Sequence, residues 1–323
     1  MSAGGSSKRA VVAALLANLG IAVAKFVGFG ITGSASMLAE SIHSVADSGN
    51  QGLLLFGSRR ARRAADAGRP FGYGRERYFW AFIVALVLFA LGGAFAVLEG
   101  ISKIRHPHEV ESAAVAVVIL VLAIALETYS FRTAIAEARK VKGTATWWQF
   151  IRRSKNPELP VVLLEDLGAE IGLVIALSAL TATLVTGDGV YDGIGTLTIG
   201  ILLTGIAILL ATEMKSLLLG ETASPEMQES IRLAIDDEPD VDRLIHLRTE
   251  HLGPDELLVV AKVAFSRTLS VADLAGAINR VEALVRARVP EARYLYIEPD
   301  LVGHHPPDDP LAPSAPRQHE EDE

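Results

Sequence analysis

The sequence contains no cysteine among its 323 residues. It therefore offers no disulfide framework, no thiolate metal ligand and no nucleophilic cysteine, and any metal chemistry falls to His, Asp and Glu. It also has no HExxH motif and no Glu placed as a base beside a pair of histidines, which disfavours an intramembrane metallohydrolase. The net charge of −8 at pH 7 argues against a nucleic-acid partner. We expect a protein that is not an enzyme.

Long apolar runs dominate what is present. Hydrophobic residues make up 50% of the chain, the mean hydropathy is +0.34, and the aliphatic residues are bunched between charge-rich segments, as membrane spans require. Six of these runs reach the roughly 20 residues that a helix needs to cross the hydrocarbon. We predict an all-α transmembrane bundle within residues 10–213, with helices at about 10–32, 36–56, 78–101, 113–131, 159–186 and 190–212.

The loops between these runs predict the orientation of the chain. Lys and Arg are concentrated in residues 58–78 and 132–160, whereas the connections GITGSA and TGDGVYD contain neither. Cytoplasmic loops carry the excess of Lys and Arg in membrane proteins. We therefore expect a multi-pass protein of the cell's inner membrane, with residues 1–9 and the C-terminus in the cytoplasm.

The last third of the chain has the composition of a soluble domain. Ser224 followed by Pro225 is a helix-start signature, and Ser270 with Asp273 three residues later has the spacing of a capping box. Together with apolar periodicity they predict the order helix, strand, strand, helix, strand, which suits a small α+β (ferredoxin-like) domain with both helices on one face of the sheet. We assign this cytosolic domain to residues 214–300. The tail 301–323, rich in Pro and acidic residues, is predicted to be disordered.

Ionisable residues interrupt two of the predicted spans. His43 and Asp47 lie four residues apart in the second span, as do Asp166 and Glu170 in the fifth, where Glu165 precedes Asp166. Residues at that spacing share one face of a helix. A charge at such depth costs roughly 2.5 to 3.5 kcal/mol on insertion scales, so it must face a partner or a wet cavity. A bound cation would serve as that partner.

Several fragments then resemble one family, the cation diffusion facilitators, which export divalent metals such as zinc in exchange for protons. They are Asn18 and Lys25 in the first span and the segments GITGSASMLAESIHSVAD, RPFGYGRERY, LLLGETASPE and IHLRTEHLGPDE. The likeness covers nearly the whole chain, and the pair Glu165-Asp166 resembles the branch of mitochondrial-type zinc transporters. The resemblance implies a homodimer that pairs through the cytosolic domain.

The resemblance also implies a metal site. His43 and Asp47 match the two ligands that the family supplies from its second span. In the fifth span we match Asp166, because Gly172 follows it at the family's spacing of six residues. A shift of four residues would match Asp166 and Glu170 instead, but it loses the agreement at Gly172.

The preferred alignment places Val162 where most members have a histidine. The fourth ligand is then missing, and the nearest replacements are Glu170, one turn after Asp166, and Glu165, its neighbour. A site of imidazole and carboxylate suits Zn²⁺. The loss of one imidazole makes the site harder, so Mn²⁺, Fe²⁺ and Co²⁺ are alternatives.

The same ligands predict how transport is coupled. Metal needs a neutral His43 and ionised carboxylates, so binding displaces protons and protonation expels metal. A cavity that opens alternately to the two sides would then exchange metal for protons, the metal being a substrate and not a resident cofactor. The alternative is a membrane-anchored metal sensor or scaffold without transport.

Some polar residues have structural interpretations that compete with a site. Asp47 and Asp166 could form structural pairs with Lys25, and Glu127 in the fourth span is expected to pair with a basic residue such as Arg132 by snorkelling to the interface. The cytosolic domain offers only weak metal candidates. Lys262 and Tyr296 stand where the resemblance suggests imidazoles, Glu298 is retained, and two histidines remain as isolated candidates, His246 and His251.

Overall fold

The computed structural model describes residues 3–32, 35–107 and 113–301. Within these ranges, the side chains of residues 3–7, 31–32, 35–43, 46 and 113 lie outside those described. Of the expected disordered tail 301–323, all but Leu301 also lies outside the described residues. The chain divides into two compact units, Met1–Leu219 and Gly220–Glu323. The last helix of the first unit, α8 (Val190–Leu219), runs past residue 213 to this division. We describe each unit by itself.

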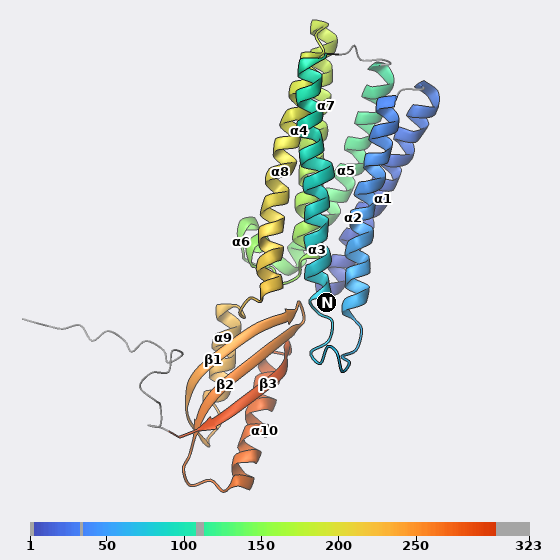
Figure 1. Cartoon of the computed structure of the whole chain (residues 1–323). Helices are drawn as coiled ribbons and strands as arrows, with labels where there is room; N and C mark the ends of the chain where they lie inside the picture. Colours follow the sequence, from blue (N-terminus) through green and yellow to red (C-terminus); the bar gives the residue numbers. More distant parts are fainter. Residues whose placement is uncertain (1–2, 33–34, 108–112, 302–323) are drawn as a thin grey trace, which may run out of the picture. The chain divides into compact units, whose positions relative to one another are not determined.

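Long helices make up the first unit (Figure 1). The third long helix consists of three consecutive segments, α3, η1 and α4, of which η1 is a π-helical turn that contains Gly92 and Gly93. The elements are α1 (Ala3–Thr32), α2 (Ala35–Ala61), α3 (Glu76–Val87), η1 (Leu88–Ala94), α4 (Phe95–Arg105), α5 (Ala113–Lys142), the short α6 (Trp147–Arg153), α7 (Glu158–Thr186) and α8 (Val190–Leu219).

The long helices pack as a ring. Around the ring, α1 contacts α2 and α2 contacts α3. Both α3 and α4 contact α8, which contacts α7. In turn, α7 contacts α5 and α5 contacts α1. α1 and α3 also contact α7. Side chains on the inner faces of α2, α5 and α7 can therefore meet, although these helices are far apart in sequence.

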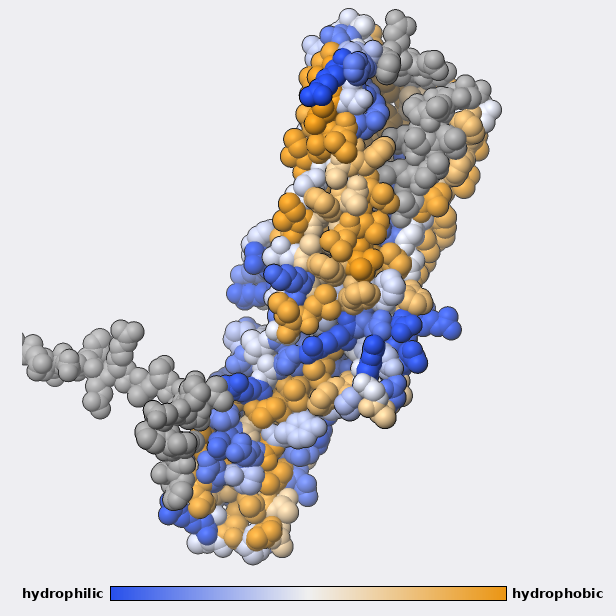
Figure 2. All heavy atoms as spheres, in the orientation of Figure 1, coloured by the Kyte–Doolittle hydropathy of each residue, from blue (hydrophilic) through white to orange (hydrophobic). Residues whose placement is uncertain are grey.

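Five of these helices are long and apolar enough to cross a membrane: α1, the α3–η1–α4 rod, α5, α7 and α8. Large apolar side chains stand exposed on them, with Leu98 at 69% and Val118 at 67%, and Figure 2 shows apolar side chains covering much of the visible face of this unit. Such a surface requires lipid. The chain is a multi-pass membrane protein. α2 is absent from the five because polar residues, among them Asn50 and Gln51, lower its hydropathy.

A small sheet with two helices forms the second unit, and its element order is the one that the sequence predicted. Ser224 Oγ accepts from Met227 N and Ser270 Oγ from Asp273 N, so both predicted caps are present. The sheet order is β1-β2-β3, antiparallel between β1 and β2 and parallel between β2 and β3. The elements are α9 (Pro225–Asp236), β1 (Val241–Gly253), β2 (Glu256–Phe265), α10 (Val271–Arg288) and β3 (Ala292–Asp300).

Both helices cover one face of this sheet. Val259, Ala261 and Val263 of β2 alternate along one face and are fully buried, in one apolar cluster with Ile231 of α9 and Val281 of α10. The intervening residues of β2, including Lys262, occupy the opposite face.

Candidate metal centre

The first half of α7 brings two carboxylates into the interior of the helical unit. Every residue from Glu158 to Asp166 is buried, and the exposed fractions of Glu165 and Asp166 are 7% and 1%. Val162, one turn before Asp166, is fully buried in an apolar cluster. The position where the resemblance leads us to expect a histidine is thus part of an apolar wall.

Hydroxyl groups of α5 hold two of the α7 carboxylates. Ser130 Oγ donates to Asp166 Oδ2 at 2.7 Å, and Thr128 Oγ1 donates to Glu170 Oε1 at 2.8 Å. The two acids lie one turn apart on α7 and the two hydroxyls two residues apart on α5, so the contact fixes how the two helices face each other.

Amide side chains connect α7 to α2 and α2 to α1. Asn50 Nδ2 donates to Glu165 Oε1 at 3.1 Å, and Asn18 Nδ2 donates to Gln51 Oε1 at 3.4 Å. Asn50 and Gln51 are almost completely buried. Because Asn50 lies three residues after Asp47, the face of α2 that bears the predicted ligand is turned toward α7.

A fifth carboxylate joins this group from α5, and here our expectation was wrong. Glu127 is 2% exposed and interacts electrostatically with Asp166, Glu165, Asp47 and Glu170. It therefore lies inside the bundle and does not snorkel to the interface. The sequence held a signal for this: Ala123, Ser130 and Ala134 are small residues at helical spacing from Glu127, and all of them are buried.

The predicted ligands Asp47, Glu165, Asp166 and Glu170 thus gather with Glu127 on the facing sides of α2, α5 and α7. Asp47 is half-buried. His43 lies one turn before Asp47 on α2, and its side chain is outside those described. Among the described side chains, no three His, Asp or Glu residues are close enough together to hold one metal ion.

The choice between Glu165 and Glu170 as fourth ligand stays a prediction, since Asn50 occupies one oxygen of the first and Thr128 one oxygen of the second. A pairing of Asp47 or Asp166 with Lys25, which is half-buried on α1, also stays a prediction.

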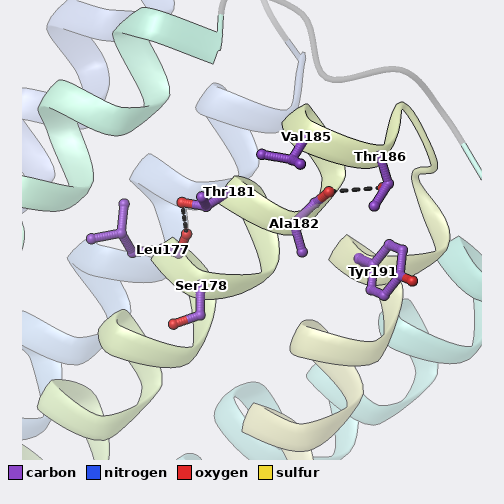
Figure 3. A pocket seen from close by; sticks show the side chains of 7 residues that line it. All are labelled: Leu177, Ser178, Thr181, Ala182, Val185, Thr186 and Tyr191. Carbon is purple, nitrogen blue, oxygen red and sulfur yellow. Dashed lines mark hydrogen bonds between the residues drawn. The ribbon is translucent and has the colours of Figure 1, made fainter.

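A hollow on the helical unit lies elsewhere, at the end of α7 and the start of α8 (Figure 3). Its polar lining consists of Ser178, Thr181, Thr186 and Tyr191, and the three Ser and Thr hydroxyls donate to carbonyls one turn earlier in their own helix. No carboxylate or imidazole lines it. The hollow therefore does not offer metal ligands of the predicted type.

In the second unit, the two candidate histidines do not converge. His246 pairs with Lys262 and His251 with Leu257, which puts them on opposite faces of the sheet. Lys262 Nζ lies 3.2 Å from Glu298 Oε1 and 3.3 Å from Asp300 Oδ2. Both contacts raise the pKa of Lys262, and the contact with Glu298 has the larger effect. An ammonium group therefore already neutralises the carboxylate that we considered as a retained ligand.

Comparison with known proteins finds a family match over the helical unit. Residues 11–219 match the model of the cation efflux transmembrane domain. The mitochondrial proton-coupled zinc antiporter SLC30A9 of Mus musculus is 32% identical over 244 residues, which cover 75% of this chain and 43% of that protein. Metal tolerance protein C4 of Arabidopsis thaliana is 32% identical over 270 residues, covering 82% and 58%.

The chain thus spans about half the length of these curated relatives. Among solved structures, a MamM-CTD variant matches 24% of this chain and 90% of its own, with 21% identity and a TM-score of 0.23. The family model covers the helical unit from residue 11, within α1, to the end of α8. This chain therefore belongs to the cation efflux family of transporters.

Proposed function

We propose that the protein is a proton-coupled antiporter that exports divalent metal cations from the cytoplasm by alternating access. Zn²⁺ is the first candidate substrate, with Mn²⁺, Fe²⁺ and Co²⁺ as alternatives. The family membership and the relatives named as proton-coupled zinc antiporters support this proposal. The observation that carries it is the interaction of the half-buried Asp47 of α2 with the buried Glu165 of α7, two helices that the hydrogen bond from Asn50 to Glu165 joins.

In this proposal α2 is a sixth membrane span. It has 27 residues, about 40 Å of helix at 1.5 Å per residue, which is enough to cross the hydrocarbon. It packs between α1 and α3. Its low hydropathy follows from carrying the site, because polar residues inside membranes face the bundle interior and mark ion pathways.

The ligands in this proposal are His43 and Asp47 of α2 and Asp166 of α7, with Glu170 or Glu165 as the fourth. Metal binding requires the deprotonated forms of these groups, so the same side chains exchange metal for protons. Ionised carboxylates buried side by side repel one another, and either a proton or a metal ion relieves that repulsion. Competition of the two cations for one site is the basis of antiport.

The orientation and assembly follow from the loops and the second unit. Both termini lie in the cytoplasm of the cell's inner membrane, in accordance with the basic residues of the α2–α3 and α5–α7 connections. The second unit, a ferredoxin-like domain in this proposal, pairs two copies into a homodimer, for which the sheet face that α9 and α10 leave uncovered is available.

Transport in proteoliposomes tests the proposal. Wild-type protein should move Zn²⁺ in exchange for protons. Asp47→Ala and Asp166→Ala should each abolish metal-driven proton movement while leaving dimer formation intact. Unchanged transport in both variants would refute the site. A wild-type protein that binds metal without moving it would favour the sensor or scaffold instead.

A further inference from the structure

The face of α5 that meets α7 carries a carboxylate outside the predicted ligand set. Glu127 is 2% exposed, and its charge interacts with those of Asp166, Glu165, Asp47 and Glu170. Glu127 therefore belongs in space to the predicted ligands, although a third helix supplies it.

Neighbours of Glu127 on α5 determine where it points. Thr128 Oγ1 donates to Glu170 and Ser130 Oγ to Asp166, at 2.8 and 2.7 Å. These two bonds lie within one turn of Glu127 and hold this stretch of α5 against the acidic face of α7. The side chain of Glu127 is thereby kept among the carboxylates and away from lipid.

Independent of the charges, several buried oxygen atoms of this region lack a donor. Glu165 Oε2, Glu170 Oε2 and Asn50 Oδ1 accept no hydrogen bond from any residue that the structure describes, and Glu165 is 93% buried, since its exposed fraction is 7%. An unsatisfied buried acceptor loses its hydration without compensation and is destabilising. A divalent cation would satisfy such oxygens, because carboxylate and carbonyl oxygens are the ligands of hard metal ions.

We propose, on the basis of the proposed transport function, that Glu127 is a metal ligand of this transporter and that its site draws on three helices, α2, α5 and α7. Binding brings the carboxylates of Glu127 and Asp166 onto one ion, which the described conformation does not yet enclose. Glu127 then adds an oxygen ligand from α5 to a site in which Val162 provides no imidazole. Since it adds oxygen where a histidine would add nitrogen, Glu127 sets a preference toward the harder metals, Mn²⁺ and Co²⁺.

Binding of Co²⁺ to the purified full-length chain tests this directly, because the visible absorption of the ion reports its ligands without any need for transport. Glu127→Gln should raise the dissociation constant of Co²⁺ roughly tenfold or more and alter the spectrum. The matched control is Glu137→Gln, which removes another buried carboxylate of α5, one paired with Lys140 at 2.5 Å. That variant should bind as the wild type does.

Equal affinity and an unchanged spectrum in Glu127→Gln would overturn the proposal, as would the same loss of affinity in Glu137→Gln. Should Glu127→Gln fail to fold, Glu127→Asp decides. It keeps the charge but retracts the carboxylate by one methylene, so the spectrum of bound Co²⁺ should change. An unaltered spectrum in that variant would also count against ligation.

Transport in proteoliposomes separates this inference from the proposed function. Glu127→Gln should lower uptake of Mn²⁺ and Co²⁺ more than uptake of Zn²⁺. If the wild type moves no metal but its metal binding depends on Glu127, the transport function is wrong and Glu127 is still a ligand. If the wild type transports metal and both Glu127→Gln and Glu127→Asp keep its order of metal preference, the transport function stands and Glu127 is not a ligand.

Discussion

Val162 stands one turn before Asp166 on α7, and its fully buried side chain packs in the apolar cluster beneath the acidic group. An imidazole at this position would be within one helical turn of Asp166 and on the same face. In the proposed site this residue is decisive: α7 offers no nitrogen ligand at this position, and the proposed ligands of α5 and α7 are carboxylates.

We predict that Val162→His shifts selectivity toward Zn²⁺, because imidazole suits zinc better than it suits manganese. The ratio of Zn²⁺ to Mn²⁺ uptake in a competition assay should rise about tenfold, by the same preference of nitrogen ligands. The matched control is Val161→His, equally buried but on another face of α7, which should lower stability without moving the ratio. An identical metal profile in wild type and Val162→His would contradict the alignment of this span.

At the scale of helices, a buried ion pair ties the start of α7 to the start of α3. Arg77 Nε lies 2.8 Å from Glu158 Oε1, and the side chains are only 10% and 5% exposed. Charges buried to this degree are stabilising only while both are present. The pair sits two turns before Glu165 on α7, so it anchors the helix that carries most of the acidic group.

We predict that Arg77→Ala lowers the free energy of unfolding by about 3–5 kcal/mol, because it leaves the carboxylate of Glu158 buried without this partner. The double variant with Glu158→Gln should lose less than the sum of the single losses. The comparison variant is Arg286→Ala, whose pair with Glu282 on α10 is half exposed and should contribute only about 0.3–0.5 kcal/mol. Thermal unfolding in detergent measures the wild type, both single variants, the double variant and Arg286→Ala, and additive losses would tell against the pair.

Glycine sets the distance between α4 and α8. A Cβ on Gly200 would lie 2.5 Å from the backbone nitrogen of Val97, and one on Gly100 would lie 2.4 Å from that of Leu197. Small residues allow this close approach of helix backbones in membranes, where packing replaces the hydrophobic effect as the force between helices.

We expect Gly200→Ala to destabilise the protein by about 1–3 kcal/mol through overpacking. Gly205 lies on the same helix with nothing within 4 Å of its missing Cβ. Gly205→Ala should be neutral or gain about 0.5–1 kcal/mol from helix propensity. The midpoint of thermal unfolding should therefore fall in Gly200→Ala and stay or rise in Gly205→Ala. A loss of the same size in both variants would rule out the close approach as the cause.

At the scale of the whole molecule, the absence of cysteine permits a clean test of orientation. A single introduced cysteine is the only thiol in the chain, because the sequence has none of its own. Thr144, after α5, and Thr186, at the end of α7, are both exposed and lie at opposite ends of α7 along the chain. The proposed orientation, based on the positive-inside rule, puts the first in the cytoplasm and the second outside.

We predict that a membrane-impermeant maleimide labels Thr186→Cys in intact cells and labels Thr144→Cys only after the membrane is opened. The cysteine-free wild type gives the background. Labelling of Thr144→Cys in intact cells would reverse the proposed orientation, and with it the direction of export.

The amino-acid order alone was enough to place the long helices of the first unit and the element order of the second. Both depend on local physics: the length of an apolar run, the periodicity of burial, and caps such as Ser224 and Ser270. The grouping of the acids within two spans was also visible, since charges in an apolar run are readable without a fold.

Only the packing of the helices decided which polar side chains meet. Glu127 resembled an isolated acid near an interface, and Asn50 an ordinary polar residue of α2, until α5 and α2 were turned toward α7. Likewise, the pairing of β1 with β2 separated His246 from His251. Rotation of a helix about its axis and the register of a strand are fixed by contacts between distant segments, so a single sequence carries them only implicitly.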